Sequence, residues 1–242
     1  MATACEHCPL RRSRLFLPHS GEDTRFMQRF KVGEMTIDPG TTLLMQGANA
    51  AQLFTALRGM GLRYQTLEDG RRQVLNFVLP GDFIGLQAGV MGEMQHSVEA
   101  SSAMTLCVFD RAGLWSLFKS QPERAFQMTW LAAVEEHFLG ETLTSVGQRT
   151  AIEAVAWALT KLMQRGEMTG LAKDGAMRMP YRQQDLADAL GLSLVHTNKT
   201  LARLRDRQLA NWQDGYLRIR DLSALATVAG TDLDALPKRP LF

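Results

Sequence analysis

Three cysteines are the side chains of this 242-residue sequence that offer the widest chemistry. Cys5 and Cys8 form a C-x-x-C pair near the start, and Cys107 lies much later, in the segment TLCVF. Thiolates bind metal ions and iron–sulfur groups, and thiols also oxidise reversibly to sulfenate or disulfide. A single cysteine between apolar neighbours, such as Cys107, is also a common packing residue. The residue types therefore predict a metal or redox site, with simple packing as the alternative for Cys107.

Hydrogen-bonding side chains of a different kind lie in residues 181–209, YRQQDLADALGLSLVHTNKTLARLRDRQL. Spacings of three and four residues predict two short helices joined by a turn at Gly191, each with one buried face. The predicted inward residues are Leu186, Ala187, Leu190, Thr197, Leu201 and Leu204. The predicted outward residues of the second helix are Val195, Asn198, Lys199 and Ala202. A helix-turn-helix needs these two faces to enter the major groove of DNA.

The elements around residues 181–209 complete a winged helix. Residues 150–165 predict an amphipathic helix, which a loop rich in Gly and Lys follows. Asp214-Gly215 separates two short β-type runs, which is the signal of a hairpin and hence of a wing. From Gly147 onward there are fourteen Lys and Arg against ten Asp and Glu, whereas the earlier residues have thirteen against fifteen. The C-terminal part is therefore better suited to phosphate contact.

Residues 30–117 have the pattern of an all-β domain. Short β-type runs alternate with turns that contain Gly, Asp or Pro, such as DPG, EDGR and LPGD. The runs are TTLLMQ, QLFTALRG, GLRYQTL, RQVLNFVL and TLCVFD. Many short strands at close spacing predict a β-sandwich or small barrel, and EDG between two runs predicts a hairpin.

A long helix is predicted from Pro122, because proline is tolerated in a first helical turn. Its two apolar stripes consist of Leu131, Val134 and Phe138 and of Trp130, Ala133 and His137. Two apolar faces need two partners, and we expect the β-domain on one side and the same helix of a second subunit on the other. The alternative is a helix buried between the domains of one monomer. Gly147 interrupts the pattern and predicts a hinge.

Composition excludes several protein classes. The sequence is 45% hydrophobic and 21% charged, and it contains neither a run of eighteen apolar residues nor an apolar secretory segment near its start. We expect a globular cytoplasmic protein with no membrane segment, whose cysteines are thiols or metal ligands. The five histidines are scattered, and no H-x-H, G-x-S-x-G or P-loop motif occurs. We therefore expect no catalysis, with a cupin-like enzyme as the remote alternative.

The order of these elements, with LPGDFIG at residues 79–85 and the helix-turn-helix, resembles the Crp/Fnr family of bacterial transcription regulators. The resemblance covers residues 25–230 and points to the Fnr/FixK-like branch. It implies an α+β fold with a cyclic-nucleotide-binding-type β-roll (jelly roll), a long dimerisation helix and a winged helix-turn-helix. The expected divisions are a cysteine-bearing arm (1–24), a β-roll sensor (25–121), a dimerisation helix and hinge (122–147), a DNA-binding domain (148–230) and a tail (231–242). The implied partners are a second copy of the chain, palindromic operator DNA and RNA polymerase.

The resemblance does not extend to the residues that hold a cyclic nucleotide in some members of the family. Those members have a Glu soon after the Gly-Asp turn and an Arg-Ser pair further on, whereas this sequence has Leu86 and His96-Ser97 there. A neutral imidazole is a poor substitute for a bidentate guanidinium clamp on phosphate. We therefore expect that cAMP is not a ligand. Side chains such as Leu86 and Met94 then fill the pocket, or the pocket binds another molecule.

Oxygen-sensing members that resemble Fnr hold an iron–sulfur cluster through several N-terminal cysteines and one cysteine in a later strand. Cys5, Cys8 and Cys107 match three of these positions, but Arg14 replaces a further cysteine. The resemblance thus implies a metal site that senses oxygen, nitric oxide or redox state. The candidates for its fourth ligand are Glu6, His7, His19 and an exogenous group. The alternatives are a regulator without metal that responds to thiol oxidation, to another small ligand or only to its own abundance.

The same resemblance assigns roles within the helix-turn-helix. Arg182, Gln183 and Ser193 are expected to contact phosphate and set the register, and Ser193 also caps the second helix. Lys199 falls where the family has a guanine-reading Arg, and Val195 replaces a common Glu, so we expect a half-site unlike those of the main branches. The other residues predicted at the DNA are His196, Asn198 and Arg203. The residues predicted at the dimer interface are Trp130, Leu131, Val134, His137 and Phe138.

Overall fold

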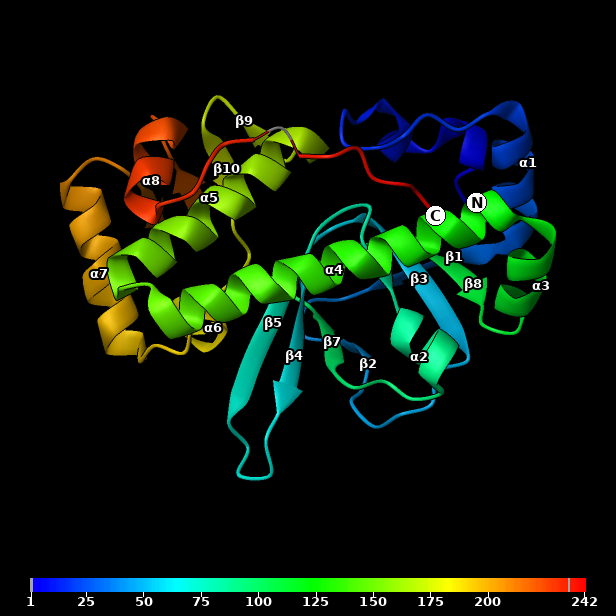
Figure 1. The fold of residues 1–242 in the computed structure, drawn as a ribbon, viewed down its shortest axis with the longest axis horizontal. Helices are drawn as coiled ribbons and strands as arrows, with labels where there is room; N and C mark the ends of the chain where they lie inside the picture. Colours follow the sequence, from blue (N-terminus) through cyan, green and yellow to red (C-terminus); the bar gives the residue numbers. More distant parts are fainter. Residues whose placement is uncertain (1, 235) are drawn as a thin grey trace. The chain divides into compact units, whose positions relative to one another are not determined.

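The computed structural model describes residues 2–234 and 236–242, and the chain divides into two units (Figure 1). The first unit contains Met1–Glu135 together with Lys238–Phe242, and we call it the β-roll unit. The second contains Glu136–Pro237, and we call it the helix-turn-helix unit. Their shared boundary lies inside a long helix, so the predicted division at residues 121 and 122 does not coincide with it.

Two four-stranded antiparallel sheets form the β-roll that the sequence predicts. One has the order β1–β8–β3–β6 and the other the order β2–β7–β4–β5. The strands are β1 Lys31–Ile37, β2 Thr42–Leu44, β3 Gln52–Arg58, β4 Gly61–Thr66, β5 Arg72–Val78, β6 Phe83–Ile84, β7 Ser97–Ala100 and β8 Met104–Asp110. Apolar side chains of both sheets, such as Phe54, Val98 and Leu106, meet in one buried core. Burial of these side chains is the main force that holds the roll together.

The five predicted strand segments coincide with β2, β3, β4, β5 and β8, and the predicted hairpin at EDG joins β4 to β5. The sequence did not indicate β1, β6 or β7. Strand β1 contains Gly33 and Glu34 and buries only Ile37 fully, so its alternation is weak. Strands β6 and β7 have two and four residues, too few for a periodic pattern.

From residue 2 onward, the N-terminal arm lies against the β-roll, where Thr3 forms hydrogen bonds with Glu34 and Lys31. Its helical turns are η1 Cys5–His7 and η2 Pro9–Arg12, and helix α1 Gly21–Phe30 follows. The Ser20 hydroxyl accepts a hydrogen bond from the Asp23 amide, and the Asp23 carboxylate accepts one from the Ser20 amide, which forms a capping box. The backbone amide of Cys5 donates to Gln28 Oε1 at 2.7 Å, so the arm is held by α1. The remaining helices of the unit are α2 Leu86–Met91 and α3 Gly113–Ser120.

Helix α4, Pro122–Gln148, begins at the predicted proline and runs through the boundary of the two units. Gly147 does not interrupt the helix, because it lies within the last turn of α4, and the hinge at Gly147 stays a prediction. The chain turns one step later, where Thr150 forms a capping box with Glu153 at the start of α5, Ala151–Thr169. One glycine costs only about 1 kcal/mol in a helix, and a strong cap is the more effective boundary.

The helix-turn-helix unit contains α5, α6 Gln183–Leu190, α7 Leu194–Asp206 and α8 Leu222–Ala229. A four-stranded antiparallel sheet of order β11–β12–β10–β9 completes it. Its strands are β9 Ala172–Lys173, β10 Ala176–Arg178, β11 Asn211–Gln213 and β12 Tyr216–Arg218. The predicted wing hairpin is confirmed, with Asp214 and Gly215 both at positive φ between β11 and β12. Strands β9 and β10, which the sequence analysis assigned to a loop, widen the wing into a small sheet.

No helix in the part of the chain that the structure describes is long and apolar enough to cross a bilayer.

Candidate DNA-binding surface and cysteine pocket

The helix-turn-helix has the buried faces that its sequence predicts. Leu186, Ala187 and Leu190 of α6 are buried. So are Thr197, Leu201 and Leu204 of α7. Gly191 ends α6 with φ +65°, a left-handed conformation that glycine adopts without steric cost. The two helices are therefore fixed to one another through one apolar seam.

The opposite face of α7 is open to solvent. Val195 is 64% exposed, and His196, Asn198 and Lys199 are also exposed. The Ser193 hydroxyl accepts a hydrogen bond from the His196 amide at 3.2 Å, so Ser193 caps α7 as predicted. One helical face thus presents two side chains able to form hydrogen bonds with base edges, Asn198 and Lys199, beside the apolar Val195.

Three further residues predicted at the DNA lie around this face of the motif. Arg203 is exposed on α7, and Gln183 is half-buried in the first turn of α6. Arg182 precedes α6 and is exposed, but its guanidinium Nη2 lies 2.9 Å from Oδ1 of the buried Asp185. That ion pair orients the Arg182 side chain at the start of α6, where a phosphate is also favoured by the helix dipole.

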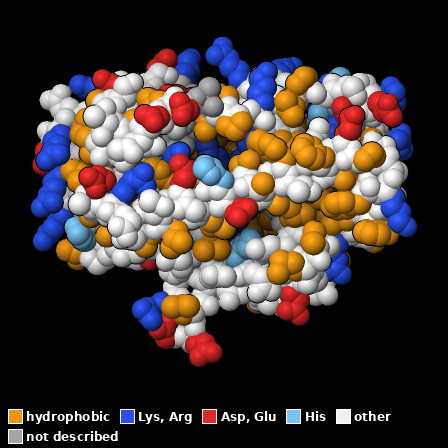
Figure 2. Space-filling view, in the orientation of Figure 1, with side chains coloured by type: hydrophobic (Ala, Val, Ile, Leu, Met, Phe, Trp, Pro, Cys, Tyr) orange, Lys and Arg blue, Asp and Glu red, His pale blue; other side chains and the backbone are white. Residues whose placement is uncertain are grey.

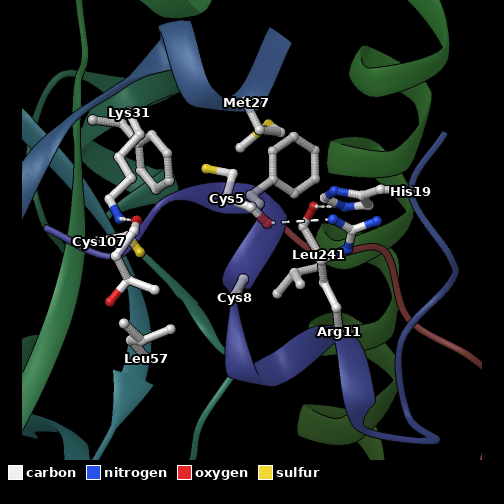
Figure 3. Close-up of a pocket in the computed structure, with 12 residues that line it drawn as sticks. Cys5, Cys8, Arg11, His19, Met27, Lys31, Leu57, Cys107 and Leu241 are labelled. Atoms are coloured by element: carbon white, nitrogen blue, oxygen red, sulfur yellow. Dashed lines mark hydrogen bonds between the residues drawn. The ribbon is translucent and has the colours of Figure 1, made fainter. Parts of the chain in front are cut away.

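The three cysteines line one pocket of the β-roll unit (Figure 3). Cys5 lies in η1, Cys8 lies between η1 and η2, and Cys107 lies in the middle of β8. Lys31, His19 and Leu241 are among the other side chains around the pocket. Folding therefore brings together thiols that are about a hundred residues apart in the sequence. Hydrogen bonds hold the arm to α1 and β1, and β1 pairs with β8, which accounts for this convergence.

Burial keeps these thiols protonated at neutral pH. It raises the pKa of Cys5 and of Cys8, and it raises the pKa of Cys107 to about 11. The Lys31 ammonium lowers all three pKa values, but burial has the larger effect. Lys31 itself is held by Glu34, with its Nζ 2.6 Å from Glu34 Oε1. Within the described residues, no three His, Cys, Asp or Glu side chains are grouped closely enough to hold a metal ion.

His19 differs from the other candidates for a fourth ligand. Its Nε2 lies 3.1 Å from the carbonyl oxygen of Leu241, and its Nδ1 is buried with no hydrogen-bond partner among the described residues. Burial and the nearby Arg124 guanidinium lower the pKa of His19, which favours the neutral ring. Glu6 and His7 are exposed and lie 3.5 Å from each other. Of the three protein candidates, only His19 lines the pocket.

Helix α4 places the residues predicted for dimerisation on two different sides. Leu131 is buried, and the Phe138 ring stacks on Trp157 of the same chain at 5.9 Å. Trp130 and Val134 are half-buried, and His137 is exposed. Leu131 and Phe138 are therefore occupied by packing within the chain. The most exposed apolar side chains of α4 are instead Phe126 at 72% and Leu143 at 73%, which the sequence analysis did not select.

The positions that the sequence analysis assigns to a nucleotide pocket hold side chains that are buried or half-buried. Met94 is fully buried in the core of the β-roll, and Leu86 is half-buried. The Ser97 hydroxyl accepts a hydrogen bond from the Gln46 amide at 3.0 Å. His96 is 8% exposed, and burial together with the Arg63 guanidinium lowers its pKa to about 4, although Glu135 opposes the shift.

The buried His96 predicts a loss of stability in weak acid. Protonation favours the unfolded chain, because the pKa of this histidine rises from about 4 to its ordinary 6.5 on unfolding. Its contribution is therefore complete above pH 6.5 and is lost as the pH falls toward 4, with a change of about 3 kcal/mol at 1.36 kcal/mol per pKa unit. Urea unfolding of the wild type and of His96→Gln from pH 7 to 4 measures it. We expect a flatter curve for His96→Gln and no flattening for the exposed control His7→Gln; parallel curves for all three contradict the assignment.

Sequence comparison finds relatives for both units. The model of the cyclic nucleotide-binding domain matches residues 34–121, and that of the Crp-like helix-turn-helix domain matches residues 153–228. The nitrogen fixation regulation protein FixK of Rhizobium meliloti is 31% identical over 74% of this chain and 78% of its own length. The transcriptional activator protein FnrL of Cereibacter sphaeroides is 25% identical over 95% of this chain and 93% of its own. The anaerobic regulatory protein of Haemophilus influenzae is 24% identical over 96% and 90%.

A solved structure has the same fold. FixK2 from Bradyrhizobium japonicum superposes with a TM-score of 0.74 and 25% sequence identity, over 84% of this chain and 98% of that one. The sequence similarity to FnrL and the structural similarity to FixK2 thus both include the β-roll, α4 and the helix-turn-helix.

Proposed function

Since the chain belongs to the Crp/Fnr family of DNA-binding transcriptional regulators, in its Fnr/FixK branch, we propose that it acts as a homodimer on palindromic operator DNA. The observation that carries this proposal is the α7 surface, whose base-reading side chains are exposed while the residues behind them are buried. Two such helices in a dimer reach half-sites about one helical turn apart. RNA polymerase is the further partner that an activator of this family requires.

Each residue of the motif has a proposed role at the DNA. Lys199 donates to a guanine, Asn198 pairs with an adenine, and Val195 contacts a thymine methyl group. His196 lies at the edge of the same face. Phosphate contacts, which fix the register without reading sequence, come from Arg182, Gln183, Ser193 and Arg203. Selection of binding sites from random duplexes tests this proposal: a two-fold symmetric consensus supports it, and the absence of any enriched sequence contradicts it.

Helix α4 is the proposed dimer interface. Figure 2 shows hydrophobic side chains gathered over the first half of α4, and Phe126 and Leu143 are more than 70% exposed. Exposed apolar side chains along a helix are typical of a helix that packs against a further partner, and we propose a second copy of the chain as that partner. Trp130 and Val134 are half-buried and His137 is exposed, so these three remain candidates for the interface. Leu131 and Phe138 pack within the chain.

The cysteine pocket is the proposed input for an oxygen or redox signal. Its support is the convergence of Cys5, Cys8 and Cys107 on one pocket, together with relatives that include an anaerobic regulatory protein. We propose an iron–sulfur group held by these three cysteines, with His19 as fourth ligand because its buried Nδ1 lacks a partner. The Nε2 of His19 faces the Leu241 carbonyl, the arrangement that orients metal-binding histidines in general. An iron–sulfur group held there would supply a chemistry that responds to oxygen or nitric oxide.

A second candidate for the input is thiol oxidation without metal. It is favoured by the absence, among the described residues, of a group already spaced to hold a metal ion. Oxidation of two thiols to a disulfide releases two protons and transfers two electrons to an oxidant such as peroxide. It requires access of the oxidant to thiols that are now half-buried or buried.

Iron analysis separates these two candidates. Protein purified without oxygen is expected to be brown and to contain iron, and to lose its visible absorbance in air. Cys8→Ser is expected to lose the iron, and His7→Ala, in the same C-x-x-C motif but exposed, is expected to keep it. His19→Ala tests the fourth ligand through the iron content and the visible spectrum. A colourless, iron-free anaerobic preparation contradicts the cluster; thiol oxidation is then tested by the effect of peroxide on operator binding.

A further inference from the structure

The segment Lys238–Phe242, which follows the helix-turn-helix unit in the sequence, packs with the β-roll unit. We call it the tail. The chain leaves the β-roll unit within α4, between Glu135 and Glu136, and rejoins it at Lys238. The helix-turn-helix unit is therefore connected to the β-roll unit at both ends of its own chain. The sequence gives no periodicity or motif that announces this second connection.

The tail pairs with the N-terminal arm through its backbone. Arg239 and Phe16 form a parallel β-bridge. The amide of Arg239 donates to the carbonyl of Leu15 at 2.7 Å, and the amide of Leu17 donates to the carbonyl of Arg239 at 2.8 Å. Two backbone hydrogen bonds in this register fix the tail as a short extra strand beside the cysteine-bearing arm.

A buried ion pair fixes the tail to the turn at residues 79–85. The Arg239 guanidinium Nη1 lies 3.2 Å from Asp82 Oδ1, and their side chains are only 13% and 6% exposed. Asp82 also accepts a hydrogen bond from the Leu79 amide at 2.9 Å, which holds the carboxylate in place. Removal of one partner of a buried pair leaves the other charge without compensation. Loss of Arg239 is therefore expected to disfavour docking of the tail.

The last two residues of the tail form part of the cysteine pocket. Leu241 and Phe242 are 4% and 5% exposed, and both line the pocket with Cys5, Cys8 and Cys107. The Leu241 carbonyl oxygen accepts a hydrogen bond from Arg124 Nη1 at 3.0 Å and lies beside His19 (Figure 3). The Phe242 carbonyl oxygen accepts one from the Thr55 hydroxyl at 2.6 Å, and the Phe242 ring lies 5.3 Å from the ring of Phe83.

We propose that the tail is a built-in ligand of the β-roll unit that closes the cysteine pocket and tethers the second end of the helix-turn-helix unit. The tail and a bulky adduct on one of the pocket thiols, such as a maleimide, compete for the same space. Docking of the tail therefore disfavours modification of the thiols, and modification disfavours docking to the same degree, because coupling between two binding events is reciprocal. Release of the tail leaves the helix-turn-helix unit attached only through α4, and a singly attached unit has more conformational freedom.

This inference rests on the proposed function in taking the cysteine pocket as the input, but it does not require a metal. It is therefore tested on reduced, iron-free, full-length protein. The first experiment measures alkylation of each cysteine by N-ethylmaleimide, followed by mass spectrometry. Arg239→Ala and Leu241→Ala are expected to speed alkylation of the pocket cysteines about tenfold or more, because reaction then needs no local opening of the tail. Lys238→Ala, which removes an exposed charge of the same tail, is expected to match the wild type.

The second experiment uses the wild type and so does not depend on how a variant folds. Hydrogen exchange of the Arg239 and Leu17 amides is expected to be slow in the reduced protein and at least about tenfold faster once the cysteines are alkylated. Equal alkylation rates in all variants, or exchange that alkylation leaves unchanged, overturns the proposal. If protein purified without oxygen contains no iron, the proposed iron–sulfur group is contradicted. The alkylation and exchange results still test the docked tail, so failure of one proposal is distinguishable from failure of the other.

Discussion

Lys199→Ala is expected to weaken binding to the selected operator by about 1–3 kcal/mol and to relax the base preference at one position of each half-site. The reason is that Lys199 lies on the exposed face of a helix whose other face is buried, where its ammonium can reach the O6 and N7 atoms of a guanine. The loss should appear on the specific site and be much smaller on random DNA. Titration of both duplexes with the wild type and the variant, at one fixed salt concentration, measures the difference.

Two comparison variants separate base reading by Lys199 from a phosphate contact and from the loss of one positive charge. Arg203→Ala is expected to weaken binding to all sequences by a similar factor and to lower the salt dependence by the equivalent of about one phosphate contact. Lys119→Ala removes the same charge from α3 of the β-roll unit and is expected to leave operator binding unchanged. If Lys199→Ala weakens specific and random DNA equally, Lys199 contacts only phosphate, and its assignment as a reader of bases is wrong.

Gly81→Ala is expected to destabilise the β-roll unit by several kcal/mol. Gly81 has φ +92°, and a Cβ placed there would lie 2.0 Å from Cζ of Phe16. The Phe16 side chain is only 6% exposed, so its ring cannot move aside without disturbing its packing. The backbone strain of a left-handed alanine adds about 1–2 kcal/mol to the cost of the clash. Urea unfolding of the wild type and the variant measures the total.

Gly92→Ala separates the clash from the backbone strain. Gly92 has φ +94°, almost the value of Gly81, but no atom lies within 4 Å of a Cβ built there. Its alanine variant should therefore lose only the strain, about 1–2 kcal/mol. Similar losses for the two variants would show that Phe16 yields easily, and the arm would then be less firmly packed than its contacts indicate. Because Phe16 pairs with Arg239, the same result would also weaken the case for a docked tail.

Much of the architecture was predictable because it depends on local signals. Five strands of the β-roll follow from short apolar runs between turn residues, and the wing follows from Asp214-Gly215. Both helices of the DNA-binding motif follow from spacings of three and four residues around Gly191. Strands too short or too exposed to show alternation, such as β1 and β7, could not be found in this way.

The amino-acid sequence by itself therefore determined five strands of the β-roll, the wing hairpin and the two faces of α7, since each depends on neighbours a few residues away. Only the tertiary structure decided that the three cysteines share one pocket and that His19 is the histidine beside them. It also placed Leu241 and Phe242 in the wall of that pocket. The tertiary structure also decided which apolar residues of α4 pack within the chain and which are exposed. These outcomes depend on contacts between segments a hundred or more residues apart, such as Arg239 with Asp82. A five-residue tail has no period from which such a contact could be inferred, because its partners lie in distant segments and fit it by shape and charge.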